Sequence, residues 1–147
     1  MKVTELIAKT RGEALSPLSR QEWEAIGRNQ ALGLSVGNVL RMADMVREHL
    51  SKRQSYGRPT IQHETVQSEM GEALSRVSLV LAQVPLEEDV SGFELPPATR
   101  KSLHQSLCQA AGKLSKLMGG HGFIQGAVHD YEYRVRVLSL IATEGAV

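Results

Sequence analysis

SRQEWEAIGRNQALGLSVGNVLRMADMVREHL, residues 19–50, is the stretch that decides the fold of this chain. Ser19 and Glu22 have the spacing of a capping box, in which each side chain bonds a free amide at the start of a helix. Beyond them, apolar or small residues recur at intervals of three, four or seven, as on one helix face: Trp23, Ile26, Gly33, Val36, Leu40, Ala43, Val46 and Leu50. The stretch predicts a helix over about residues 20–54.

Gly33 and Gly37 lie four residues apart on one side of this predicted helix. Glycine costs a helix about 1 kcal/mol relative to alanine. A second backbone that packs closely against the two glycines would offset this cost. We therefore expect a close neighbour on that side.

The rest of the chain continues in the same helical pattern. Tyr56-Gly57-Arg58-Pro59 ends the first helix, because glycine leaves helical geometry and proline cannot continue it. Further periodic segments predict helices over about residues 61–83, 97–118 and 127–143. Steps of four and three along the third helix suit a shallow bundle crossing. No strand-like alternation of useful length appears.

We predict an all-α fold, an antiparallel (up-down) four-helix bundle over residues 19–147, preceded by an N-terminal extension over residues 1–18. A chain of 147 residues with 41% hydrophobic content suits one domain. Its 17 basic and 16 acidic residues give a net charge of +1, which supplies no electrostatic reason to expect nucleic acid or an anionic membrane. No apolar run approaches the roughly 18 residues of a membrane span, and no leader opens the chain.

The usual signatures of metal and thiol chemistry are missing. The five histidines form no zinc-like cluster, so we expect no metal. Cys108 is the single cysteine, which excludes an internal disulfide. It stands in a helical pattern and suits a buried packing thiol. The simplest compartment for such a chain is the reducing cytoplasm.

Two short segments stand out, RQSYGRPTI (53–61) and MGGHGF (118–123). On spacing alone, the first segment is interpreted as the end of a helix followed by a turn, and the second as a glycine-rich loop between helices. The first resembles the Arg-x-x-Phe-Gly-x-Pro-Ile stretch of acyl-CoA dehydrogenases, with Tyr56 in the place of phenylalanine. The second resembles the Gly-Gly-x-Gly-Phe/Tyr loop of that family, and Asp130 and Arg134 have the offsets of the carboxylate and arginine that follow the loop.

Two further matches extend this resemblance. Arg28 is similar to the family's arginine on its opening helix, and ATEG (142–145) resembles the Tyr-Glu-Gly-Thr turn that carries the catalytic base. The matches run in family order from Gln21 to Gly145. The sequence therefore resembles the C-terminal helical domain of the acyl-CoA dehydrogenase and oxidase family, present as a stand-alone chain.

The resemblance implies a part in oxidising an acyl thioester with FAD, which a flavin-binding partner subunit would supply or complete. Glu144 is then the candidate catalytic base, and Arg28 lies on the substrate side. The residues implied in cofactor binding are Arg53, Tyr56, Lys116, Gly119, Gly120 and Gly122. Arg53 would reach the FAD diphosphate of a neighbouring subunit, since a guanidinium matches phosphate oxygens. The family buries this domain in an oligomer, which implies a homo-dimer or homo-tetramer.

The sequence leaves open whether the chain is active. An active form would be an FAD-dependent enzyme acting on a CH–CH donor, and not active alone. The alternative is a non-catalytic helical module for oligomerisation or docking. It is favoured because Lys116 and Glu64 replace family glutamines, and because one extra residue before Glu144 would rotate that side chain by about 100°. A piece cut from a longer enzyme is a third possibility.

Overall fold

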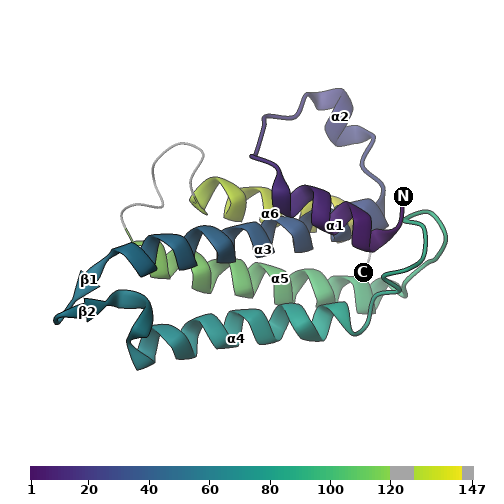
Figure 1. Cartoon of the computed structure of the whole chain (residues 1–147). Coiled ribbons are helices and arrows are strands. Elements are labelled where there is room, and N and C mark those ends of the chain that lie inside the picture. Colours follow the sequence, from purple (N-terminus) through teal and green to yellow (C-terminus); the bar gives the residue numbers. More distant parts are fainter. Residues whose placement is uncertain (120–127, 144–147) are drawn as a thin grey trace.

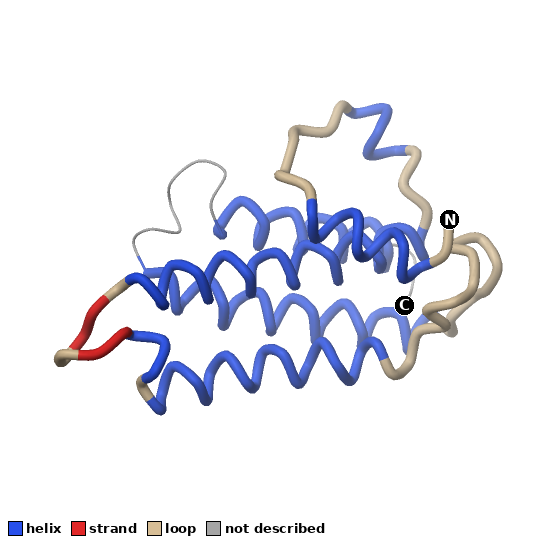
Figure 2. Tube along the Cα trace, viewed as in Figure 1, coloured by secondary structure: helices blue, strands red, loops and turns tan. Residues whose placement is uncertain are grey.

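The computed structural model describes residues 1–119 and 128–143. The described chain is mainly helical, and the all-α class is confirmed (Figure 2). Its helices are α1 (Val3–Gly12), α2 (Arg20–Glu24), α3 (Arg28–Lys52), α4 (Glu64–Leu81), α5 (Pro97–Met118) and α6 (Val128–Thr143). Two-residue strands β1 (Gln54–Ser55) and β2 (Arg58–Pro59) form a hairpin before a 3-10 turn, Thr60–Gln62.

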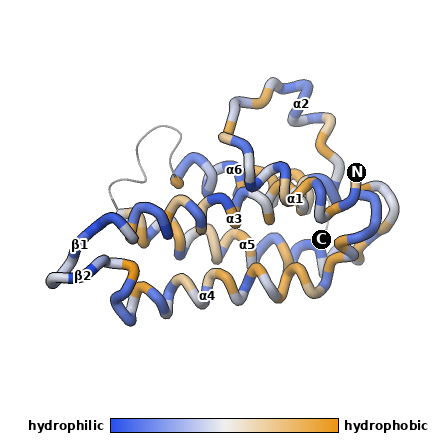
Figure 3. Tube along the Cα trace, viewed as in Figure 1, coloured by the Kyte–Doolittle hydropathy of each residue, from blue (hydrophilic) through white to orange (hydrophobic). Residues whose placement is uncertain are grey.

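The long helices α3, α4, α5 and α6 lie alongside one another, and α2 stands apart from them (Figure 1). Helix α3 lies between α1 and the pair α5 and α6, whereas α4 packs chiefly on α5. Hydrophobic residues recur along the traces of these helices (Figure 3). The buried apolar face of α3 is made of Ala31, Leu32, Val36, Val39, Met42, Ala43, Val46 and Leu50. The main core therefore follows α3 from Leu32 to Leu50, and Ala31 belongs to a smaller apolar cluster at the start of the helix.

The helix expected over residues 20–54 is divided in two. The capping box at its start is present, with Glu22 N donating to Ser19 Oγ over 3.1 Å and Ser19 N donating to Glu22 Oε1 over 3.2 Å. It begins a helix of only five residues. A second start follows at Gly27, whose amide donates to Gln30 Oε1 over 3.3 Å. Glycine weakens a helix interior, and here it begins a new helix instead.

The close neighbour expected beside Gly33 and Gly37 is α1, which lies within residues 1–18. A Cβ on Gly37 would lie 2.5 Å from Thr10 Cβ and 3.0 Å from the Ile7 carbonyl oxygen, and a Cβ on Gly33 would lie 2.8 Å from Leu6 Cδ2. Only glycine permits this approach of two helices. The expectation of a close approach is confirmed, and the N-terminal segment is part of the packed structure.

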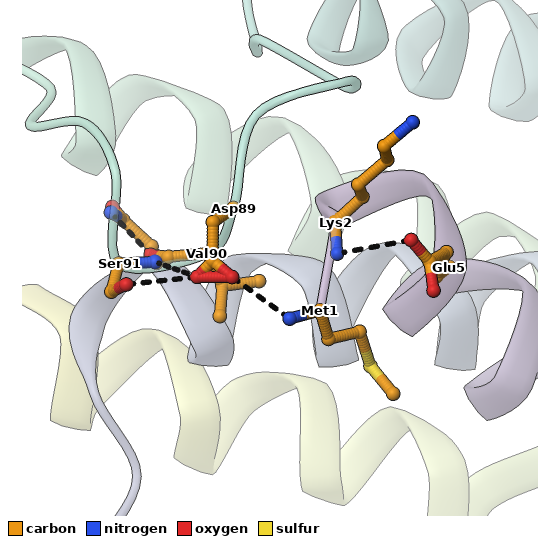
Figure 4. Close-up of polar contacts among 7 residues, drawn as sticks. Met1, Lys2, Glu5, Asp89, Val90 and Ser91 are labelled. Atoms are coloured by element: carbon orange, nitrogen blue, oxygen red, sulfur yellow. Dashed lines mark hydrogen bonds and ion pairs between the residues drawn. The ribbon is translucent and has the colours of Figure 1, made fainter.

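The first residues of the chain are also held by the segment between α4 and α5 (Figure 4). The amide of Val3 donates to the Glu88 carbonyl over 3.0 Å, and the amide of Val90 donates to the Met1 carbonyl over 3.0 Å. The amino group of Met1 contacts Asp89 Oδ1 at 2.8 Å. Hydrogen bonds from this ammonium and from Ser91 lower the pKa of Asp89 to about 2. Two segments distant in sequence are thereby joined.

Within residues 1–119 and 128–143, no helix combines the length and apolar character that crossing a bilayer requires.

Candidate functional site

The first segment that stood out in the sequence, residues 53–61, and the described start of the second, Met118 and Gly119, lie at the same end of the molecule. Helices α3 and α5 both end there, and the β1–β2 hairpin projects beyond them (Figure 1). Gly119 follows α5 with φ +58°, a backbone conformation that favours glycine. Gly120 and Gly122 lie outside the described residues. The structure therefore brings Arg53, Tyr56, Lys116 and Gly119 to one end.

The hairpin corrects the expectation of a helix that continues to about residue 54. Helix α3 ends at Lys52, and Arg53 is extended with φ −81° and ψ 135°. The amide of Thr60 donates to the Arg53 carbonyl over 2.7 Å, which closes the hairpin. Tyr56 and Gly57 form its turn with φ of 54° and 81°. Positive φ at both central residues is the pattern of a two-residue hairpin turn that matches strand twist.

The side chain of His63 contacts both strands of this hairpin and stabilises it. Its Nε2 lies 2.8 Å from the Ser55 carbonyl oxygen, and its Nδ1 lies 3.5 Å from Arg58 Nη2. A carbonyl only accepts and a guanidinium only donates, so the Nε2–H tautomer satisfies both contacts. The Tyr56 ring stands edge-on to His63 with centroids 5.8 Å apart. Ser55 and Thr60 hydroxyls add a bond of 2.8 Å. The hairpin thus holds its exposed side chains on a defined backbone.

The exposed side chains at this end include several cations. Tyr56 is 99% exposed at the hairpin tip. Arg53 and Lys116 are exposed, and in the described part of the chain neither forms an ion pair. An unpaired guanidinium and ammonium beside an open glycine backbone suit an anionic ligand such as a phosphate. This is the property that the predicted diphosphate contact requires.

A charged groove of about 640 Å³ leads from Gly119 along the outer face of α5. Lys113 on its floor contacts Glu69 Oε2 at 3.2 Å and Glu72 Oε2 at 3.1 Å, and these hydrogen bonds raise the pKa of Lys113. On the α6 side, Arg136 Nη2 contacts Glu132 Oε2 at 2.9 Å. Burial acts to raise the pKa of Glu132, but hydrogen bonds from Arg136 and other groups outweigh it and lower the pKa. Most charged side chains along the groove are therefore paired with an opposite charge, whereas Lys116 at the end of the groove forms no ion pair with another described residue.

Cys108 opens onto this groove and is half-buried. Burial raises the pKa of its thiol, against a hydrogen bond with Ser139 that acts to lower it. A thiol with a raised pKa carries little thiolate near neutral pH and is a poor nucleophile. The expectation that Cys108 is buried is therefore wrong, since its side chain is half-buried beside the groove.

Arg28 does not join the Arg53 group. It is the first residue of α3, and the 25 residues of that helix separate the two arginines by roughly 36 Å. Ala31, Leu138 and Ala142 pack together, which places the last turn of α6 beside the first turn of α3. Glu144 lies outside the described residues, one position beyond α6. Arg28, the predicted substrate-side residue, and Arg53, a predicted flavin-side residue, are thus at opposite ends of α3.

Arg134 has a local role that sequence reasoning missed. Its Nη2 donates to the Ser16 carbonyl, and its guanidinium lies 5.4 Å from the centre of the Trp23 ring. Burial lowers the pKa of Arg134. This side chain therefore fastens the segment between α1 and α3 onto α6. The aromatic at position 23 was a usable signal, because arginine commonly stacks on tryptophan.

Within residues 1–119 and 128–143, no three His, Cys, Asp or Glu side chains are grouped so as to hold a metal ion.

Comparison with known proteins gives a likeness in structure and none in sequence. No family model matches the sequence, and no curated protein matches it. The structure is similar to the crystal structure of a protein assigned as an acyl-CoA dehydrogenase from Mycobacterium smegmatis, with a TM-score of 0.62 and 21% sequence identity over 81% of this chain. The match covers 35% of that protein, so this chain spans about a third of its length. The likeness establishes a shared fold.

Proposed function

We propose that this chain is a C-terminal-domain-like component of an acyl-CoA dehydrogenase-type oxidoreductase, and that α3–α6 form the corresponding up-down bundle. The observation that carries the proposal is the braced hairpin, which holds Arg53 and Tyr56 outward at the end where α5 reaches Gly119. The same motifs run in family order along the sequence, and the fold likeness to an assigned acyl-CoA dehydrogenase supports the same lineage.

The residues present fit the diphosphate and adenosine part of FAD. Arg53 and Lys116 are exposed cations without ion pairs among the described residues, and a Cβ on Gly119 would meet nothing within 4 Å. Flavin supplies hydride acceptance when bound. The role of this chain is then to bind and orient: Arg53 neutralises phosphate charge in a neighbouring subunit, and the Gly119 backbone admits the ligand closely. Glu144 would take the α-proton of an acyl thioester.

Two exposed apolar side chains on α6 support the proposed homo-oligomer. Tyr133 and Leu140 are each 71% exposed and lie seven residues apart, so they share a helix face. A second subunit that covers this face would remove both side chains from water. We propose a dimer or tetramer. Sedimentation equilibrium that shows only monomer at high concentration would contradict it.

The proposal is tested by the visible absorption spectrum of the purified protein, alone and titrated with FAD. We expect added FAD to bind, and Arg53→Gln to weaken that binding by about tenfold, since one charge-assisted hydrogen bond is worth that much. Arg20→Gln is the matched control, because Arg20 is an exposed arginine on α2. Equal FAD affinity in the Arg53 variant and the wild type would count against the proposed contact.

A second candidate is the non-catalytic docking module, and the position of Arg134 favours it. This arginine belongs to the family-like loop motif, yet here it is occupied by the chain's own Ser16 and Trp23. The N-terminal segment thereby covers a face of α6 that the motif would otherwise offer to another domain. The two candidates differ in outcome: a docking module keeps its biological activity in the Arg53→Gln variant, and a flavin-completing component loses it.

A further inference from the structure

A cavity of about 440 Å³ lies at the N-terminus of α3, at the far end from the hairpin. Its walls come from the start of α3, the loop over residues 90–94 and the first turns of α5. The Asn29 side-chain amide donates to the carbonyl oxygens of Val90 and Phe93, over 2.9 and 2.7 Å. These bonds fix the loop against the helix, so the cavity has a built wall.

Arg100 lines this cavity and is only 4% exposed. Its Nη2 donates to the Leu95 carbonyl over 2.8 Å, while its buried Nε has no partner. No acidic side chain of residues 1–119 or 128–143 forms an ion pair with it. A guanidinium stays charged in proteins, and a buried charge is costly unless it is paired. The position of Arg100 therefore points to a missing anion.

The start of α3 supplies further positive potential to the same cavity. The first amides of a helix have no intrahelical partners, and those of Arg28, Asn29 and Gln30 are at this end. A helix of 25 residues adds its dipole to these free donors. Arg28 lines the cavity as an exposed cation, and Glu94 is the acidic side chain at its rim. Two arginines and a helix N-terminus outweigh that one carboxylate.

We infer that this cavity binds a phosphate group, either inorganic phosphate or the phosphate end of a small ester. Backbone amides at a helix start and a guanidinium fork are the donors that phosphate oxygens prefer. The volume exceeds that of a bare ion, which leaves room for a small group esterified to the phosphate. The inference does not rest on the flavin proposal, because the cavity lies at the other end of α3 from the hairpin.

The test is thermal unfolding of the whole chain in inorganic phosphate, compared with chloride at matched ionic strength and pH. We expect phosphate to raise the Tm of the wild type. Arg100→Met should abolish that rise, since it removes both the charge and the donors. Arg28→Gln should shift the phosphate dependence to at least about fivefold higher concentration. Arg20→Gln, which changes an exposed arginine on α2, should respond as the wild type does.

A wild type that gains no stability from phosphate would overturn the inference, as would an Arg100→Met variant that responds equally. Arg28 is exposed, so Arg28→Gln keeps the core intact and decides the question if Arg100→Met does not fold. Glycerol phosphate in place of inorganic phosphate separates the two ligand sources, since only an ester site prefers it.

Discussion

Replacing Gly37 by alanine should destabilise the protein, although the same change at an ordinary helix position stabilises it. The added Cβ would lie 2.5 Å from Thr10 Cβ and 3.0 Å from the Ile7 carbonyl oxygen. Both atoms belong to the α1 backbone or are attached directly to it, so neither can swing aside. Helix α1 must therefore move away from α3.

The size of the effect follows from two opposing quantities. Overpacking of a tight contact costs about 1–3 kcal/mol, and the helix propensity of alanine returns about 1 kcal/mol. We expect a net loss of up to about 2 kcal/mol in the free energy of unfolding, and about 1 kcal/mol at the middle of the overpacking range. The largest possible loss in the free energy of unfolding corresponds to complete detachment of α1 from α3. The buried side chains of α1 are Val3, Leu6 and Ile7. At about 1.5–3 kcal/mol each, their burial contributes roughly 5–9 kcal/mol.

Urea unfolding followed by circular dichroism measures this loss, with two further glycines as comparators. Gly33→Ala meets only the end of the Leu6 side chain, at 2.8 Å, so it should cost less than Gly37→Ala. Gly71→Ala in α4 meets nothing within 4 Å and should stabilise by about 0.5–1 kcal/mol. If Gly37→Ala proves as stable as Gly71→Ala, α1 does not pack on α3 as described. Detachment of α1 would also lower the m-value.

Three other perturbations test separate parts of the structure. Burial, and then the charge of Arg100, lower the pKa of His104 to about 4. Below about pH 6.5 the unfolded chain binds a proton on this histidine that the folded chain does not bind. The free energy of unfolding should therefore fall by up to about 3 kcal/mol between pH 6.5 and pH 4, and this fall should be absent in His104→Leu. Gly57→Ala places a side chain at φ 81° and should cost about 1 kcal/mol by thermal melting. Ser19→Ala removes a cap worth about 1 kcal/mol and should speed amide exchange in α2, with little change in global stability.

The long helices could be predicted from the sequence because their pattern depends only on which residues face a core. Helices α4, α5 and α6 lie within about three residues of the ranges that periodicity indicated. The division at Gly27 was harder to foresee, because the apolar face continues through it. Gln30 was the available signal, since a side chain three residues after a start can bond its amide. At this position the chain ends one helix and begins another, capped by Gln30, although the apolar pattern would have allowed a continuous helix.

The candidate site was predicted as a set of residues and not as a geometry. The glycine pair at 33 and 37 indicated a close neighbour, but the sequence carried no sign that the neighbour was α1. The segment at Tyr56 was expected only as a turn and not as a hairpin. A tyrosine with positive φ is uncommon. The hydrogen bond between His63 and the Ser55 carbonyl, which stabilises the hairpin, could not be read from the sequence. The burial of Arg100 was not predicted, because arginine is usually exposed and the sequence pattern gives no sign of which arginine is buried.

The pairing of residues 1–4 with residues 86–90 also affects the order of assembly during translation. Helix α1 leaves the ribosome early, and its contact surface on α3 follows within a few seconds at about 5–20 residues per second. The strand-like partner around Asp89 lies 37 residues beyond the end of α3 at Lys52, so it emerges roughly three seconds after α3 at about 12 residues per second. Until then the amino-terminal end has only one of its two attachments. A chaperone or a protease in the cell would meet this half-anchored state, and slow codons before position 86 would lengthen its lifetime.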